Sequence, residues 1–126
     1  MTTSGQFAVA VTCIDGRIQE AVAESVRRTH GVRYVDVVTV PGVDGALQES
    51  RSARQQVRDA VAVSIEAHGS RVAVVAGHTD CAGHPVDEAQ HGRDVHAAVE
   101  WLHGEFSDLI VLGALVDTAT GRARPV

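Results

Sequence analysis

The sequence FAVAVTCIDGR, from Phe7 to Arg17, joins an apolar run to three chemically active side chains. Its first six residues are almost continuously apolar, which is typical of a parallel strand that is covered on both faces. Cys13 follows directly, and Asp15 and Arg17 come after it at alternate positions. A thiol, a carboxylate and a guanidinium therefore stand where a buried strand is expected to end.

Three further valine-rich runs predict strands of the same sheet, and the segments between them have helical periodicity. The strands are expected at Phe7–Thr12, Tyr34–Val40, Arg71–Ala76 and Leu109–Val116. The apolar stripes of the helices are Ile18, Val22 and Val26; Val57, Val61 and Ile65; and Val95, Val99 and Leu102. Each stripe is followed by a glycine that is expected to end the helix: Gly31, Gly69 and Gly104.

The alternation of strands and helices predicts an α/β fold. We expect a single domain over residues 1–126 with three layers, in which a central, mostly parallel four-stranded sheet of order 2-1-3-4 carries helices on both faces. A short fifth strand at the edge is expected after the turn residues Asp117–Arg122. Two loops, Pro41–Ser50 and Ala82–Gly92, follow strands and are expected at the edge of the sheet where ligands bind.

Composition excludes several classes of function. A net charge of −5 argues against a nucleic-acid partner, which needs clustered cations. All 11 basic residues are arginine, and the absence of lysine excludes Schiff-base chemistry and a P-loop. The polar start MTTSGQ predicts no signal peptide, and no apolar segment approaches the ~20 residues that cross a bilayer. We therefore expect a cytoplasmic protein with no membrane partner.

The two cysteines of the chain and one histidine stand at the ends of two predicted strands. Cys13 closes the first strand, and His78 and Cys81 close the third in the segment GHTDC. Strands one and three are neighbours in the common doubly wound orders, so these side chains are expected to meet. Two thiolates and one imidazole with an open fourth position are typical of catalytic zinc, and thiolates favour zinc over magnesium or calcium.

Other interpretations of these residues stay open. A buried cysteine is often only a small apolar residue, and two cysteines at neighbouring strand ends could form a redox pair. If the chain stays extended through Arg17, then Cys13, Asp15 and Arg17 share one side; if the helix begins earlier, Asp15 caps it instead. Beside a metal, Asp15 could fill the fourth position or accept a hydrogen bond from bound water, whose pKa zinc lowers to about 7.

The remaining histidines are expected on the surface or at helix ends. His84 is the most interesting of them, because it lies three residues past Cys81 on the loop. The full set is His30, His68, His84, His91, His96 and His103.

Three segments together resemble the β-class carbonic anhydrases. CIDGR resembles the Cys-x-Asp-x-Arg motif of that family, and GHTDCAG resembles its Gly-His-x-x-Cys-Gly-Gly motif. The tail VLGALVDTATGRARPV is similar to the family's last strand and Asp-x-x-Thr-Gly turn. The resemblance implies a zinc lyase that reversibly hydrates carbon dioxide to bicarbonate by zinc-bound hydroxide. It implies Cys13, His78 and Cys81 as zinc ligands, with Asp15 and Arg17 as the catalytic pair.

The resemblance also implies a homodimer or higher homo-oligomer, although the helical arm that usually wraps the partner subunit has no counterpart here. The loop Pro41–Leu47 departs from the family pattern. Two alternatives stay open. The altered loop could direct the same zinc site to a sulfur analogue, carbonyl sulfide or carbon disulfide, whereas the missing arm and a shortened pocket favour a protein that binds zinc without turnover. Whether Asp15 ligates zinc in a closed form of the site stays open.

Overall fold

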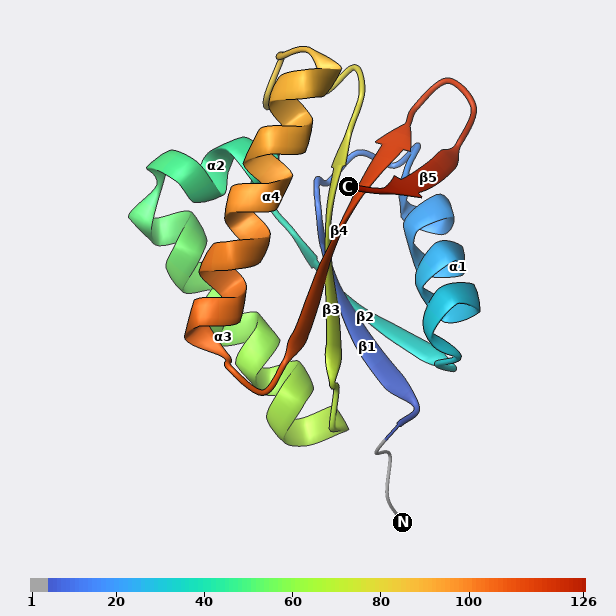
Figure 1. The fold of residues 1–126 in the computed structure, drawn as a ribbon, viewed down its shortest axis with the longest axis vertical. Coiled ribbons are helices and arrows are strands. Elements are labelled where there is room, and N and C mark those ends of the chain that lie inside the picture. Colours follow the sequence, from blue (N-terminus) through green and yellow to red (C-terminus); the bar gives the residue numbers. More distant parts are fainter. Residues whose placement is uncertain (1–4) are drawn as a thin grey trace.

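A computed structural model describes residues 5–126 and has the predicted α/β architecture (Figure 1). Residues 1–4, which begin the MTTSGQ segment, lie outside the described residues. The elements are β1 (Phe7–Thr12), α1 (Gln19–His30), β2 (Tyr34–Thr39), α2 (Val43–Glu49), α3 (Arg51–His68), β3 (Val72–His78), α4 (Glu88–Glu105), β4 (Ile110–Asp117) and β5 (Arg122–Pro125). Within the described residues, no helix is long and apolar enough to cross a membrane.

The sheet of the described residues has five strands in the order β2-β1-β3-β4-β5. The first four are mutually parallel, and β5 pairs antiparallel with β4. The predicted order and the short fifth edge strand are both confirmed. Because β1 and β3 are hydrogen-bonded neighbours with Val11 opposite Val75, their carboxyl ends lie at the same edge of the sheet.

The two faces of β1 carry side chains of different size. Val9 and Val11 belong to the core cluster that packs against α3 and α4, whereas Ala8 and Ala10 belong to the cluster under α1. Figure 1 shows α2, α3 and α4 on one side of the sheet and α1 on the other. Alternation along a strand sends neighbouring residues to opposite faces, so this pattern produces three layers with unequal helical cover.

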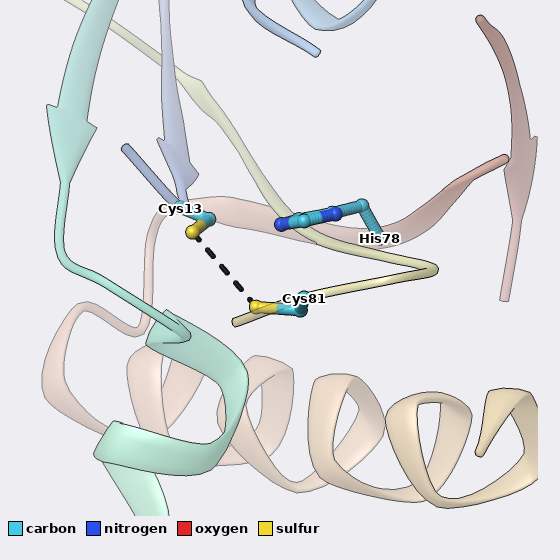
Figure 2. Close-up of side chains that lie close together, drawn as sticks. All are labelled: Cys13, His78 and Cys81. Carbon is cyan, nitrogen blue, oxygen red and sulfur yellow. Dashed lines mark hydrogen bonds between the residues drawn. The ribbon is translucent and has the colours of Figure 1, made fainter. Parts of the chain in front are cut away.

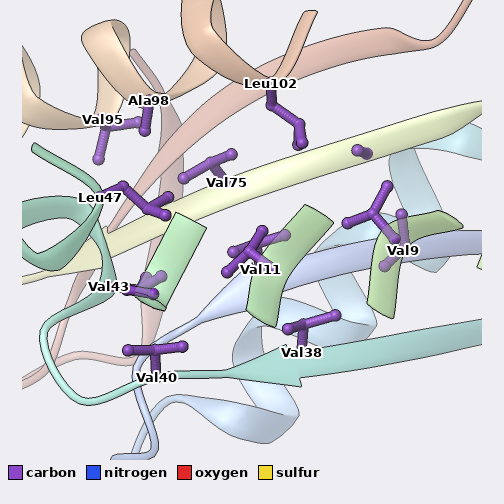
Figure 3. Packing of buried hydrophobic residues seen from close by; sticks show 14 of the residues in the cluster. Val9, Val11, Val38, Val40, Val43, Leu47, Val75, Val95, Ala98 and Leu102 are labelled. Carbon is purple, nitrogen blue, oxygen red and sulfur yellow. The ribbon is translucent and has the colours of Figure 1, made fainter. Parts of the chain in front are cut away.

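The larger core lies between the sheet and α2, α3 and α4 (Figure 3). Its fully buried side chains include Val57 and Val61 of α3, and Val95 and Leu102 of α4. Each such side chain contributes roughly 1.5–3 kcal/mol when it is removed from water. This packing fixes the positions of α2 and α4, which stand beside the carboxyl ends of β1 and β3.

Several boundaries differ from the sequence-based expectation. Strand ends shift by one or two residues, and the expected loop Ala82–Gly92 is shorter, because α4 begins at Glu88 with Asp87 as its N-cap. The segment Pro41–Ser50, expected as a loop, contains α2, because Val43 and Leu47 are one helical turn apart and both are buried. Gly104 lies inside α4 rather than after it, so the prediction of a stop there is wrong. Gly31 and Gly69 do end their helices, with φ of 65° and 69° that favour glycine.

Candidate metal centre

Cys13 and Cys81 come together at the carboxyl edge of the sheet (Figure 2). Their Sγ atoms are 3.9 Å apart, both side chains are buried, and both are free thiols. Two thiolates bound tetrahedrally to one zinc ion at about 2.3 Å stand about 3.8 Å from each other. The separation of the two sulfurs therefore fits a shared ion without rearrangement.

His78 presents one bare ring nitrogen at the same place. Its Nδ1 lies 2.7 Å from the carbonyl oxygen of Thr79 and 3.2 Å from Oγ1 of Thr118. Because a carbonyl only accepts, Nδ1 carries the proton and Nε2 carries the lone pair. Nε2 is buried and has no hydrogen-bond partner among the described residues. Metal-bound histidines usually have this arrangement, with the other ring nitrogen donating to a carbonyl or carboxylate.

Cys13, His78 and Cys81 thus form one group, whose ligand atoms all lie within 4.8 Å of one another. Figure 2 shows the imidazole extending toward the two sulfurs from the other side. The set of two sulfurs and one nitrogen suits zinc, and three protein ligands leave a fourth position for solvent. The prediction that the three residues meet is confirmed, whereas their role as zinc ligands stays a prediction.

The loop that contains Gly42, between β2 and α2, contacts Cys13 and packs against the loop that contains Cys81. The N–H of Gly42 donates to Sγ of Cys13 at 3.3 Å. A Cβ on Gly42 would lie 2.5 Å from the carbonyl carbon of Gly83, so the two loops pack backbone against backbone. Burial raises the pKa of the Cys81 thiol, and the neighbouring Cys13 raises it further. Binding of a metal at Cys81 must therefore release a proton.

Asp15 and Arg17 form a tight ion pair beside this group. The chain turns after Ile14, so it does not stay extended through Arg17. Asp15 does not cap α1 either, because the N-cap residue is Ile18, whose side chain makes no capping hydrogen bond. Asp15 accepts the backbone N–H of Arg17 at 2.9 Å and its Nη2 at 2.7 Å. These bonds hold the pKa of the Asp15 carboxyl well below its usual range. Asp15 is thus an ionised acceptor at neutral pH.

Arg17 also contacts Asp80, which the sequence analysis did not single out. Its Nη1 lies 3.1 Å from Oδ2 of Asp80, and its Nη2 donates to the Asp80 carbonyl at 3.1 Å. Asp80 has a left-handed φ of 54°, which turns the chain between His78 and Cys81. Arg17 therefore links the CIDGR segment to the HTDC turn.

A second group, which the sequence analysis missed, combines Asp44, His84 and His91. Its ligand atoms also lie within 4.8 Å of one another. The expectation that His91 lies on the surface or at a helix end is wrong, because its side chain is fully buried in α4. The apolar stripe of α4 extends one turn earlier than predicted, through positions 91, 95, 98 and 102. That spacing is the signal by which the sequence could have revealed His91.

A comparison with known families decides the relationship. A family model described as "Putative carbonic anhydrase" matches residues 3–123. The chain belongs to this carbonic anhydrase family. No curated protein matches it.

Solved structures of other carbonic anhydrases share the fold of this family member. It is 22% identical to the carbonic anhydrase of Streptococcus mutans, with a TM-score of 0.67, and the match covers 100% of this chain and 85% of that one. For the beta-carbonic anhydrase isoform I of Trichomonas vaginalis, the identity is 15%, the TM-score 0.61 and the coverage 99% and 85%. A tetrameric beta-carbonic anhydrase from Sordaria macrospora is 12% identical, with a TM-score of 0.61 and coverage of 100% and 82%.

Proposed function

We propose that this family member is a zinc-dependent lyase that reversibly hydrates carbon dioxide to bicarbonate, with Cys13, His78 and Cys81 as the zinc ligands. One observation carries the proposal. Two free thiols stand 3.9 Å apart beside a buried imidazole nitrogen that has no hydrogen-bond partner within residues 5–126. Zinc held there would lower the pKa of its bound water from ~15.7 to about 7 and so supply a nucleophile at neutral pH.

The surrounding residues have separate tasks in this proposal. The backbone carbonyl of Thr79 accepts a hydrogen bond from Nδ1–H of His78 and so keeps Nε2 available for the metal. Asp15, ionised because of Arg17, accepts a hydrogen bond from solvent at the fourth position and orients it. Arg17 holds that carboxylate through its side chain and its backbone N–H. The carboxylate of Asp15 does not belong to the group of ligand atoms that lie within 4.8 Å of one another. This favours an open form of the site, in which solvent rather than Asp15 occupies the fourth position.

The test is stopped-flow hydration of carbon dioxide by protein loaded with one equivalent of zinc. The proposal predicts turnover above the uncatalysed rate that disappears when the zinc is removed and returns when zinc is restored. Zinc bound without any turnover would support the non-catalytic alternative instead. Turnover of carbonyl sulfide well above that of carbon dioxide would move the substrate to the sulfur analogue.

A homo-oligomer is also proposed. The face of the sheet that α1 alone covers leaves Val37, Ile110 and Leu112 exposed. A second copy would cover this apolar surface, and a solved neighbour of the same fold is tetrameric. Light scattering of the purified protein gives the mass, and Leu112→Asp is expected to lower it to that of one chain if this face forms the contact.

The cytoplasm is the proposed location. The two cysteines of the chain are free thiols, which persist in reducing compartments. Fractionation of cells that express the protein should place it with cytoplasmic markers, and recovery with secreted material would contradict the proposal.

A further inference from the structure

In the group formed by Asp44, His84 and His91, the first and last side chains are buried and His84 is partly buried, and the carbonic anhydrase proposal gives none of them a role. The side chain of His91 is 0% exposed and that of Asp44 is 2% exposed. The three residues come from α2, the loop after β3, and α4. A carboxylate and two imidazoles in such a place need compensating partners, because burying an uncompensated charge costs several kcal/mol.

Hydrogen bonds within the group account for only part of its polar atoms. Nδ1 of His91 lies 2.7 Å from Oδ2 of Asp44, and Nε2 of His84 lies 2.6 Å from Oδ2 of Asp94. His84 thus has one ring nitrogen engaged by a carboxylate outside the group, as metal-bound histidines commonly do. For His91 and Asp44 to bind one ion, the ion would take the place of the proton between Nδ1 and Oδ2. Nε2 of His91 is buried and has no hydrogen-bond partner among the described residues. Within that part of the chain, the only other buried side-chain nitrogen or oxygen in this condition is Nε2 of His78, in the first site.

The backbone is shaped to admit the two rings. A Cβ on Gly45 would lie 2.3 Å from Nδ1 of His84, so any larger residue there would displace the ring. A Cβ on Gly77 would lie 3.2 Å from Oδ2 of Asp44. The two imidazoles are nearly perpendicular, with centroids 5.2 Å apart. The rings are therefore packed at fixed positions around the carboxylate.

We propose that Asp44, His84 and His91 form a second metal site, which holds a divalent transition-metal ion through one oxygen and two nitrogens. Asp44 and the neighbouring Asp94, which pairs with His84, would balance the charge of such an ion. Ligands at 2.0–2.2 Å from one ion stand about 3–4 Å apart, so Nδ1 of His91 and Oδ2 of Asp44 would move slightly apart to admit the ion. Because this site lacks sulfur ligands, it would not share the preference of the first site for metals that bind thiolates.

The second ion would stabilise the first site by fixing the backbone segments that contact its two cysteines. Asp44 lies two residues after Gly42, whose N–H donates to Cys13, and the N–H of His84 donates to the carbonyl of Cys81. A metal that joins α2, α4 and the loop at His84 would hold these two donors in place. The inference does not depend on turnover at the first site.

Titration with Co²⁺ separates the two sites, since only the first gives thiolate-to-cobalt charge-transfer absorption. In the wild type, we expect this absorption to saturate at about one equivalent, while the total bound cobalt found by elemental analysis reaches about two. In His91→Gln, the total should fall to about one with the absorption unchanged, and the intact absorption shows that the variant is folded. His96→Gln, an exposed histidine on the same helix, should still bind about two.

Two results would overturn the inference. One is a wild type that binds about one equivalent in total, all of it with thiolate absorption. The other is a total that is the same in His91→Gln and Asp44→Asn as in the wild type. If instead the thiolate absorption is absent but an equivalent that depends on His91 remains, the second site stands and the zinc assignment of the first site fails.

Discussion

The two histidine-containing groups of this protein have similar ligand spacing but different surroundings. The ligand side chains of both groups are largely buried, but beside Cys13, His78 and Cys81 stands the Asp15–Arg17 ion pair, whose guanidinium is half exposed. The group of Asp44, His84 and His91 lies between helices, and its central pair is sealed from solvent. The comparison indicates that the chemistry beside the ligands, rather than their spacing or burial, separates a site suited to catalysis from one suited to holding structure.

The largest difference between the two groups should follow from Cys81→Ser. This change removes one of two thiolates, and we expect zinc retention at the first site and carbon dioxide hydration to fall to background. The group around His91 shares no side chain with Cys81, so its cobalt equivalent should remain. Zinc content and stopped-flow rates measure the first effect. Normal activity in this variant would show that Cys81 is not a ligand.

Removal of His91 should affect stability rather than chemistry. His91→Leu leaves the buried Asp44 carboxylate without its partner, and such a change costs about 3–5 kcal/mol in free energy of unfolding. Urea unfolding of protein loaded with one equivalent of zinc measures it. Replacing both partners, with Asp44→Val added, should recover part of the loss, and the exposed His96→Leu should cost little. A small cost for His91→Leu would mean that this buried pair is not important for stability.

Asp15→Asn should separate catalysis from metal binding within the first site. An amide is a weaker acceptor than a carboxylate, so we expect kcat to fall by about 10²-fold while zinc stays bound. Asp80→Asn is the matched control, because Asp80 also pairs with Arg17 but is 82% exposed. If Asp15→Asn hydrates carbon dioxide at the wild-type rate, the role given to Asp15 is wrong.

The smallest effect should come from Arg17→Gln, and it should depend on pH. The pKa of Asp15 is lowered in the folded protein by Arg17, so the stabilisation from this pair is present above the unfolded pKa of about 3.9 and disappears as the pH falls below it. The difference in urea midpoint between wild type and variant should therefore be larger at about pH 6 than at about pH 3. A difference that does not change with pH would contradict this origin.

The sequence predicts the first of the two groups but not the second, and this difference has a physical cause. Cys13 and His78 lie at the ends of neighbouring parallel strands, and strand periodicity with the usual sheet order brings them together. Asp44, His84 and His91 meet only through the packing of α2 against α4, which no local pattern specifies. The sequence pattern predicts a loop at Pro41–Ser50, and a loop gives no helix on which to place Asp44.

X-ray absorption at the zinc edge, on protein loaded with one equivalent of zinc, tests the central claim most directly. The account predicts two sulfur neighbours at about 2.3 Å together with nitrogen and oxygen neighbours at about 2.0–2.1 Å. A spectrum without sulfur neighbours would contradict it, because Cys13 and Cys81 would then not hold the ion.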